Sequence, residues 1–143
     1  MSAAESGTQA CVRFQACLPS ELRILGGLTP FPDEQFLVQA EVDAPPFLRL
    51  VSAQQDLAFN VLEPFEVDEE YTPELIEDDL RLLGLETTAA AGFLALVNLS
   101  HGSRAATINL AAPIAFNPAT GSAKQVILRN AMSYHVRQRI FPD

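Results

Sequence analysis

Short runs in which apolar and polar residues alternate dominate this chain. Alternation predicts β-strands, because successive side chains point to opposite faces of a sheet. Such runs, together with continuous apolar runs of strand length, occur at 11–16, 22–25, 35–41, 47–52, 57–62, 92–99, 105–112, 114–116 and 124–128. Many short strands at this spacing are typical of a β-barrel. We therefore expect a mainly β, small, closed or nearly closed β-barrel-like domain.

One segment carries a helical pattern instead. Its apolar residues recur every three or four positions and form a single stripe: Ile76, Leu80 and Leu83, with Leu75 beside it. Thr72 is a favourable N-cap, Pro73 suits the first helical position, and Gly84 suits the position after the last turn. The pattern predicts one short helix, at about Pro73–Leu83.

Length and charge restrict the classes of protein to consider. The chain has 143 residues, which predicts one folded domain over 11–143 after a disordered, small and polar tail at 1–10. The formal net charge of −9 disfavours direct contact with nucleic acid or an anionic membrane, because both need clustered Lys and Arg. The acidity either attracts a basic protein partner or only keeps the domain soluble.

No targeting, metal or catalytic motif stands out. The longest apolar run, at 89–97, is too short to span a bilayer, so we expect a cytoplasmic protein without membrane contact. Cys11 and Cys17 do not have the spacing of a zinc site. His101 lies in a Ser-His-Gly-Ser sequence without a nucleophile-elbow motif, and we interpret it as an ordinary loop residue. We therefore expect neither a cofactor nor an enzyme, and a small-molecule enzyme with a pocket around His101 is the weaker alternative.

The segment 106–128 carries the most specific sequence pattern. It reads as a strand, a proline break, a strand, a turn with glycine and a further strand, and Pro113 should mark an edge, a bulge or a strand switch. The segment resembles the signature of the flagellar assembly factor FliW family. The matching residues are Thr107, Asn109, Leu110, Ala112, Pro113, Ile114, Asn117, Gly121, Lys124, Gln125, Val126, Ile127 and Leu128. Ile108 departs from the small residue usual in the family.

Further segments match the family in the same order. Residues 46–52 and 56–64 resemble two of its strand motifs, with Val51 in place of Gln and Glu63 in place of Asp. Tyr71 precedes the expected helix, and 134–137 resembles the terminal Tyr-x-x-Arg. The loop at 27–32 departs from the family, because proline stands where the second glycine is usual.

The resemblance implies a fold and a function. Members of this family are small, cytoplasmic, β-barrel-like regulators and not enzymes. They bind the RNA-binding translational repressor CsrA and antagonise it allosterically, and flagellin displaces them from CsrA by binding them in turn. The resemblance thus implies a partner switch that controls flagellin translation. The alternative is a cytoplasmic chaperone that holds flagellin without binding CsrA.

Acidic residues concentrate around the expected start of the helix. Nine acids and no Lys or Arg lie between Glu63 and Asp79. Carboxylates in the first helical turn are explained by the helix dipole. Four that precede it are not: Glu66, Asp68, Glu69 and Glu70. Our hypothesis is that these four contact a basic surface of CsrA and repel RNA phosphates from it, and the alternative is a solvated acidic face.

Two other groups of residues are candidates for binding. Asn109, Asn117 and Lys124 belong to the family pattern, and each is either a partner contact or a structural residue. The C-terminal stretch is apolar at five positions: Met132, Tyr134, Val136, Ile140 and Phe141. This stretch either closes the barrel, at least through Tyr134 and Val136, or offers a groove for an amphipathic flagellin terminus.

Overall fold

The computed structural model describes residues 18–28, 35–41, 46–99 and 102–141. The expected tail at 1–10, the strand at 11–16, both cysteines, His101 and most of the 27–32 loop lie outside these ranges. The described strands are β1 (Glu21–Ile24), β2 (Gln35–Ala40), β3 (Leu48–Ser52), β4 (Ala58–Leu62), β5 (Gly92–Asn98), β6 (Thr107–Ile108), β7 (Ile114–Phe116), β8 (Ser122–Gln125) and β9 (Gln138–Arg139). The described helices are α2 (Glu77–Leu83) and the 3-10 helices η2 (Pro64–Glu66), η3 (Thr88–Ala90), η4 (Ser103–Ala105) and η5 (Ala131–Ser133).

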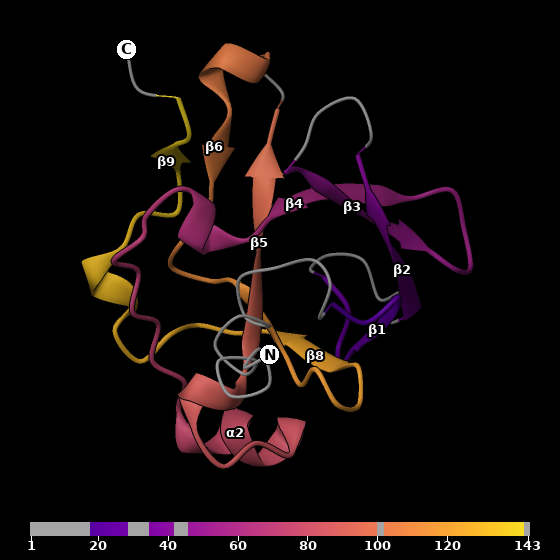
Figure 1. The fold of residues 1–143 in the computed structure, drawn as a ribbon, viewed down its shortest axis with the longest axis vertical. Helices are drawn as coiled ribbons and strands as arrows, with labels where there is room; N and C mark the ends of the chain where they lie inside the picture. Colours follow the sequence, from indigo (N-terminus) through magenta and orange to yellow (C-terminus); the bar gives the residue numbers. More distant parts are fainter. Residues whose placement is uncertain (1–17, 29–34, 42–45, 100–101, 142–143) are drawn as a thin grey trace, which may run out of the picture.

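The strands form a closed barrel from which a short extension projects (Figure 1). Neighbouring strands follow the order β4-β3-β2-β1-β8-β7-β5, and the pairing of β4 with β5 closes the ring. All these pairings are antiparallel except that of β1 with β8. Strands β6 and β9 continue the sheet beyond β5 at the opposite end of the long axis from α2. The predicted mainly β barrel is confirmed. Strands β3 and β4, which are consecutive in the chain, pair antiparallel as a hairpin.

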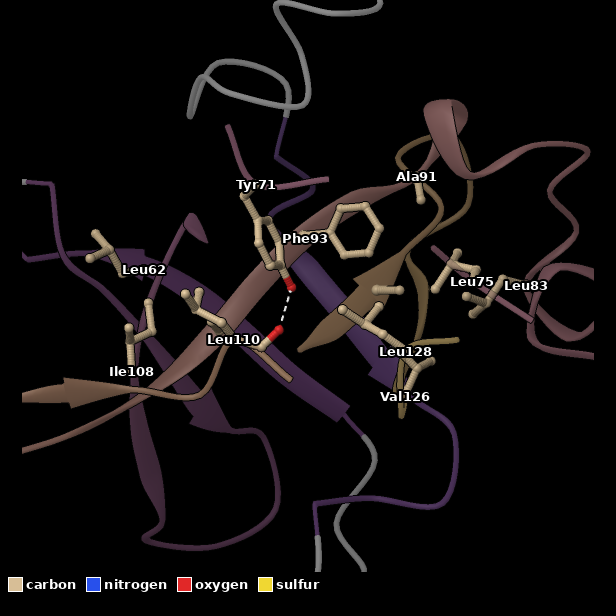
Figure 2. Packing of buried hydrophobic residues seen from close by; sticks show 12 residues of the cluster. Leu62, Tyr71, Leu75, Leu83, Ala91, Phe93, Ile108, Leu110, Val126 and Leu128 are labelled. Atoms are coloured by element: carbon tan, nitrogen blue, oxygen red, sulfur yellow. Dashed lines mark hydrogen bonds between the residues drawn. The ribbon is translucent and has the colours of Figure 1, made fainter. Parts of the chain in front are cut away.

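Two apolar clusters fill and cover the barrel. One gathers inward-facing residues of the strands, among them Leu22, Phe36, Leu50 and Ile114. The other lies between the barrel and the segments that cover it, and Figure 2 shows Tyr71, Phe93, Leu110 and Val126 within it. The alternating sequence pattern has its expected physical cause in β1 and β3, where every second residue is buried and so removed from water.

The segment 105–112 is not the continuous strand that its pattern predicts. Ile108 pairs with Val97 of β5, but Ile114 pairs with Leu94. The chain thus advances six residues, from 108 to 114, while β5 advances three, from 97 to 94. The three extra residues form a wide bulge, which ends at Pro113. A proline fits there because it has no N–H to donate to the ladder, and this confirms the predicted role of Pro113.

Helix α2 begins at Glu77, so the predicted start at Pro73 is wrong. The backbone of the preceding residues is bonded elsewhere. The N–H of Thr72 donates to the Tyr134 hydroxyl oxygen at 2.9 Å, and the N–H of Leu75 donates to Thr88 Oγ1 at 3.2 Å. Thr72 is therefore no N-cap, because tertiary partners hold its segment extended.

The predicted end of the helix is confirmed. Gly84 follows α2 with φ 73°, in the left-handed region that glycine occupies without strain. The predicted stripe is partly wrong, because Ile76 is 38% exposed. Leu75 is buried in its place, together with Leu83.

Candidate functional site

The four acids predicted to bind CsrA lie together where η2 ends. We call Glu66, Asp68, Glu69 and Glu70 the acidic corner. Glu66, Glu69 and Glu70 are exposed, whereas Asp68 is half-buried. The Asp68 Oδ1 atom accepts the N–H of Glu70 at 2.9 Å and so fixes the turn. Among the described residues, none of the four forms a salt bridge, so the corner presents three exposed carboxylates without a neutralising cation.

Tyr71, which follows the acidic corner directly in the chain, attaches it to the barrel and is called the Tyr71 anchor below. The Tyr71 hydroxyl donates to the carbonyl oxygen of Leu110 at 2.7 Å, as Figure 2 shows. Its ring packs edge-on against Phe65 and Tyr134, with centroids 5.6 and 4.7 Å away. Burial raises the pKa of Tyr71 well above its ordinary value, and the proximity of Tyr134 and Asp68 adds to the shift. The phenol therefore stays protonated and keeps donating.

Asn130 holds the next residues of the same segment. Its Oδ1 atom accepts the N–H of Glu74 at 3.1 Å, and its Nδ2 atom donates to the carbonyl oxygen of Thr72 at 2.8 Å. The N–H of Arg129 also donates to the carbonyl oxygen of Glu74 at 2.8 Å. Segment 72–74 is thereby joined to the chain after β8. Sequence analysis missed Asn130, whose only signal is an amide residue shortly after an apolar strand.

Asn109 stabilises the wide bulge. Its Oδ1 atom accepts the N–H groups of Ala111 and Ala112 at 3.1 and 3.0 Å. It also lines an open hollow of about 190 Å³, together with Thr107, Val136 and other residues of β5 and the C-terminal segment. These contacts give Asn109 a structural function within the bulge, and its contact with a partner stays a prediction.

Asn117 and Lys124 both hold α2 against the barrel. The Asn117 Nδ2 atom donates to the carbonyl oxygen of Leu83 at 2.9 Å, at the C-terminal end of the helix. The Lys124 Nζ atom lies 2.5 Å from Asp79 Oδ1 in its first turn. The Asp79 side chain is 3% exposed and that of Lys124 is 36% exposed. The structure thus places both residues beside α2 and not at the acidic corner, and partner contact by either stays a prediction.

The C-terminal stretch borders a second hollow, of about 240 Å³, which we call the corner groove. Its lining includes Glu66 and Val67 on one side and Ile140 and Phe141 on the other. The predicted closure of the barrel by this stretch is wrong, because β4 and β5 close it. Tyr134 packs against a core cluster, whereas Val136 is 60% exposed.

Within 18–28, 35–41, 46–99 and 102–141, no group of His, Cys, Asp and Glu side chains has the geometry of a metal site. No helix in the same ranges is both long and apolar enough to cross a membrane. His135 is exposed, and its main-chain oxygen accepts the N–H of Leu110 at 3.0 Å.

Comparison with known proteins identifies the family. The family model described as FliW protein matches residues 12–140. The chain belongs to the FliW family. A FliW relative from Symbiobacterium thermophilum, named flagellar assembly factor FliW, is 32% identical over 118 residues, which cover 80% of this chain and 85% of the relative. One of the same name from Bacillus velezensis is 36% identical over 116 residues, covering 80% of each.

The fold agrees with a solved FliW structure. The match with a crystal structure of the flagellar assembly factor FliW has a TM-score of 0.76 and 28% sequence identity, and it covers 87% of each chain. The FliW resemblance expected from 106–128 and from the shorter motifs is therefore confirmed for the chain as a whole.

Proposed function

We propose that this chain regulates flagellar assembly in the cytoplasm by binding proteins and not by catalysis. In this proposal it binds the RNA-binding regulator CsrA through the acidic corner and antagonises it allosterically. Flagellin binds it in turn and displaces it from CsrA. CsrA then represses flagellin translation until flagellin export reverses the exchange. Membership of the FliW family supports the proposal, because the relatives carry the name flagellar assembly factor.

The acidic corner is the observation that carries the CsrA part of the proposal. Clustered like charges repel one another and lower the stability of a fold. Here Asp68 and the Tyr71 anchor nevertheless hold three exposed glutamates close together. A protein that binds RNA must present Lys or Arg to the phosphates. The corner is suited to such a surface, and once bound it would place negative charge near the RNA path.

A switch between two partners needs only competing equilibria. If differential affinity alone changed the ratio of flagellin-bound to CsrA-bound protein from 1:99 to 99:1, it would have to supply about 5.5 kcal/mol. A rise in free flagellin supplies part of this by mass action. The proposal therefore requires that the two partners exclude each other, and it does not require a large conformational change in this chain.

Isothermal titration calorimetry tests the proposal. CsrA and flagellin from the source organism are titrated separately and then in competition. A corner variant replaces four acids: Glu66→Gln, Asp68→Asn, Glu69→Gln and Glu70→Gln. Asn at 68 keeps the oxygen that accepts the Glu70 N–H. A control variant removes four exposed acids elsewhere: Glu21→Gln, Asp56→Asn, Glu77→Gln and Glu86→Gln.

The two variants have the same net charge but different predicted affinities. With its three exposed acids each contributing a pair worth about 0.2–1 kcal/mol, or about 0.6–3 kcal/mol together, the corner variant should bind CsrA roughly 3- to 160-fold more weakly at low salt. Its affinity should also depend less on salt, because fewer ion pairs form. The control should stay close to wild type. Equal affinity of the two variants would refute the role of the corner.

The alternative function is a flagellin chaperone that does not bind CsrA. The apolar side chains exposed along the C-terminal segment, such as Val136 and Phe141, favour it as contacts for a flagellin terminus. The same titrations discriminate the two functions. Tight flagellin binding without any CsrA binding would establish the chaperone and exclude the switch.

A further inference from the structure

The corner groove lies directly beside the acidic corner, and Glu66 belongs to both. We propose that this groove receives one apolar side chain of a basic protein segment, flanked there by Lys or Arg residues that contact the acidic corner. The proposal rests on the proposed function, because it takes CsrA as the protein that supplies this segment. The acidic corner by itself would contribute only electrostatic contacts with CsrA, and the groove adds an apolar contact to them.

The size and lining of the groove suit a single anchor. Six of its lining residues are apolar: Pro46, Phe47, Leu62, Val67, Ile140 and Phe141. Its volume is about 240 Å³, whereas sites for small molecules commonly have about 300–1,000 Å³. A benzene ring enters a cavity of about 150 Å³. The groove therefore has room for one aromatic or large aliphatic side chain.

Backbone hydrogen bonds hold the walls of the groove in place. The N–H of Val67 donates to the carbonyl oxygen of Pro64 at 3.0 Å, which closes η2. The N–H of Ile140 donates to the carbonyl oxygen of Ala106 at 3.1 Å on the facing wall. A pocket with fixed walls costs little conformational entropy when it is filled, so this groove is suited to binding an anchor tightly.

The charge around the groove determines which residues of the partner are favoured on either side of its apolar residue. Glu66 lines it, and exposed Glu69 and Glu70 follow on the next turn. Beside Phe141, the Arg139 side chain uses its Nη2 atom to donate to the carbonyl oxygens of Phe141 and Arg104, at 3.2 and 3.4 Å. The mouth is therefore acidic on the η2 side. Glu66 would repel an acidic segment, and a neutral segment would gain only from the apolar lining. A segment with Lys or Arg beside its apolar residue fits both features.

The two features should affect different rate constants. Apolar anchors that fill pockets dominate the free energy of binding and slow dissociation, whereas charges at the rim mainly speed association. A substitution that blocks the groove with a side chain of this protein should therefore raise the dissociation rate of CsrA at every salt concentration. Neutralising Glu66 should lower the association rate at low salt only.

A matched pair of substitutions tests the proposal. Val67→Phe places a larger side chain in the corner groove, and Val136→Phe does the same in the hollow beside Asn109. Surface plasmon resonance at low and high salt measures CsrA binding to each full-length variant. We expect Val67→Phe to weaken binding at least about tenfold, mainly through faster dissociation. Val136→Phe should bind CsrA as wild type does.

Thermal unfolding shows whether each variant is folded, and its flagellin binding is measured separately. If Val67→Phe does not fold, Phe141→Ala replaces it, because Phe141 is 46% exposed and its loss perturbs the core less. A folded groove variant that binds CsrA like wild type would overturn the anchor while leaving the acidic corner intact. Loss of flagellin binding alone would overturn the choice of CsrA as occupant. Absence of CsrA binding by the wild type would overturn the proposed function itself.

Discussion

Substituting Tyr71 by Phe removes one hydroxyl from the centre of the molecule and leaves the ring in place. That hydroxyl donates to the carbonyl oxygen of Leu110 at 2.7 Å, and both residues are only 2% exposed. The ring contacts with Phe65 and Tyr134 do not depend on the hydroxyl. The change therefore isolates the bond that connects the acidic corner to the wide bulge.

The expected loss of stability follows from the burial of the acceptor. A buried polar group that loses its partner costs about 1–3 kcal/mol. For 143 residues, an unfolding entropy of about 2.1 cal/mol/K per residue gives roughly 0.3 kcal/mol/K. The melting temperature should fall by roughly 3–10 °C. Tyr134→Phe is the control, and it should cost less than about 1 kcal/mol because water can replace the half-buried hydroxyl of Tyr134.

The same bond predicts an alkaline signature. Burial raises the pKa of Tyr71 above its ordinary value near 10. Above pH 10 the unfolded chain releases this proton while the folded chain keeps it, so the unfolded state binds fewer protons and stability falls as pH rises. The slope for one proton reaches about 1.4 kcal/mol per pH unit. Tyr71→Phe lacks this contribution, so its deficit relative to wild type should shrink above pH 10 and stay constant below it.

Urea unfolding followed by circular dichroism, at several pH values on either side of 10, measures both effects. The reasoning would be refuted if Tyr71→Phe cost no more than Tyr134→Phe near neutral pH. It would equally fail if the deficit stayed constant above pH 10, because the buried phenol would then not be the group that titrates.

Three further substitutions test other contacts, each by thermal and urea unfolding. Lys124→Met leaves the buried Asp79 carboxylate unpaired and should lower the free energy of unfolding by about 1–3 kcal/mol, which is less than the cost of breaking a fully buried pair. Adding Asp79→Asn should restore this stability in full, whereas an unchanged stability of Lys124→Met would contradict the reasoning. Gly92→Ala places a Cβ atom in steric conflict with the Phe116 ring and should cost about 1–3 kcal/mol or more. Phe116→Leu should partly relieve it. Asn117→Ala should cost about 1–3 kcal/mol by freeing a buried helix-end carbonyl.

Local sequence patterns determined much of this protein. Alternation predicted the strands because burying one face of a strand is a local requirement that appears in the order of residues. Gly84 marked the end of α2 because a left-handed residue there needs glycine. Pro113 marked the bulge because a proline has no N–H for the ladder. The grouping of Glu66, Asp68, Glu69 and Glu70 was also visible, since residues so close in sequence stay close in space.

Only the tertiary structure decided the features that depend on distant partners. Helix α2 begins late because Tyr134, Thr88 and Asn130 bind the backbone before it, and no local propensity contains that competition. The pairing of β4 with β5 closes the barrel, so the C-terminal segment does not have to. The corner groove likewise forms between residues more than 70 positions apart, Val67 and Ile140. A sequence pattern records which side chains avoid water, but contacts between distant segments decide where they meet.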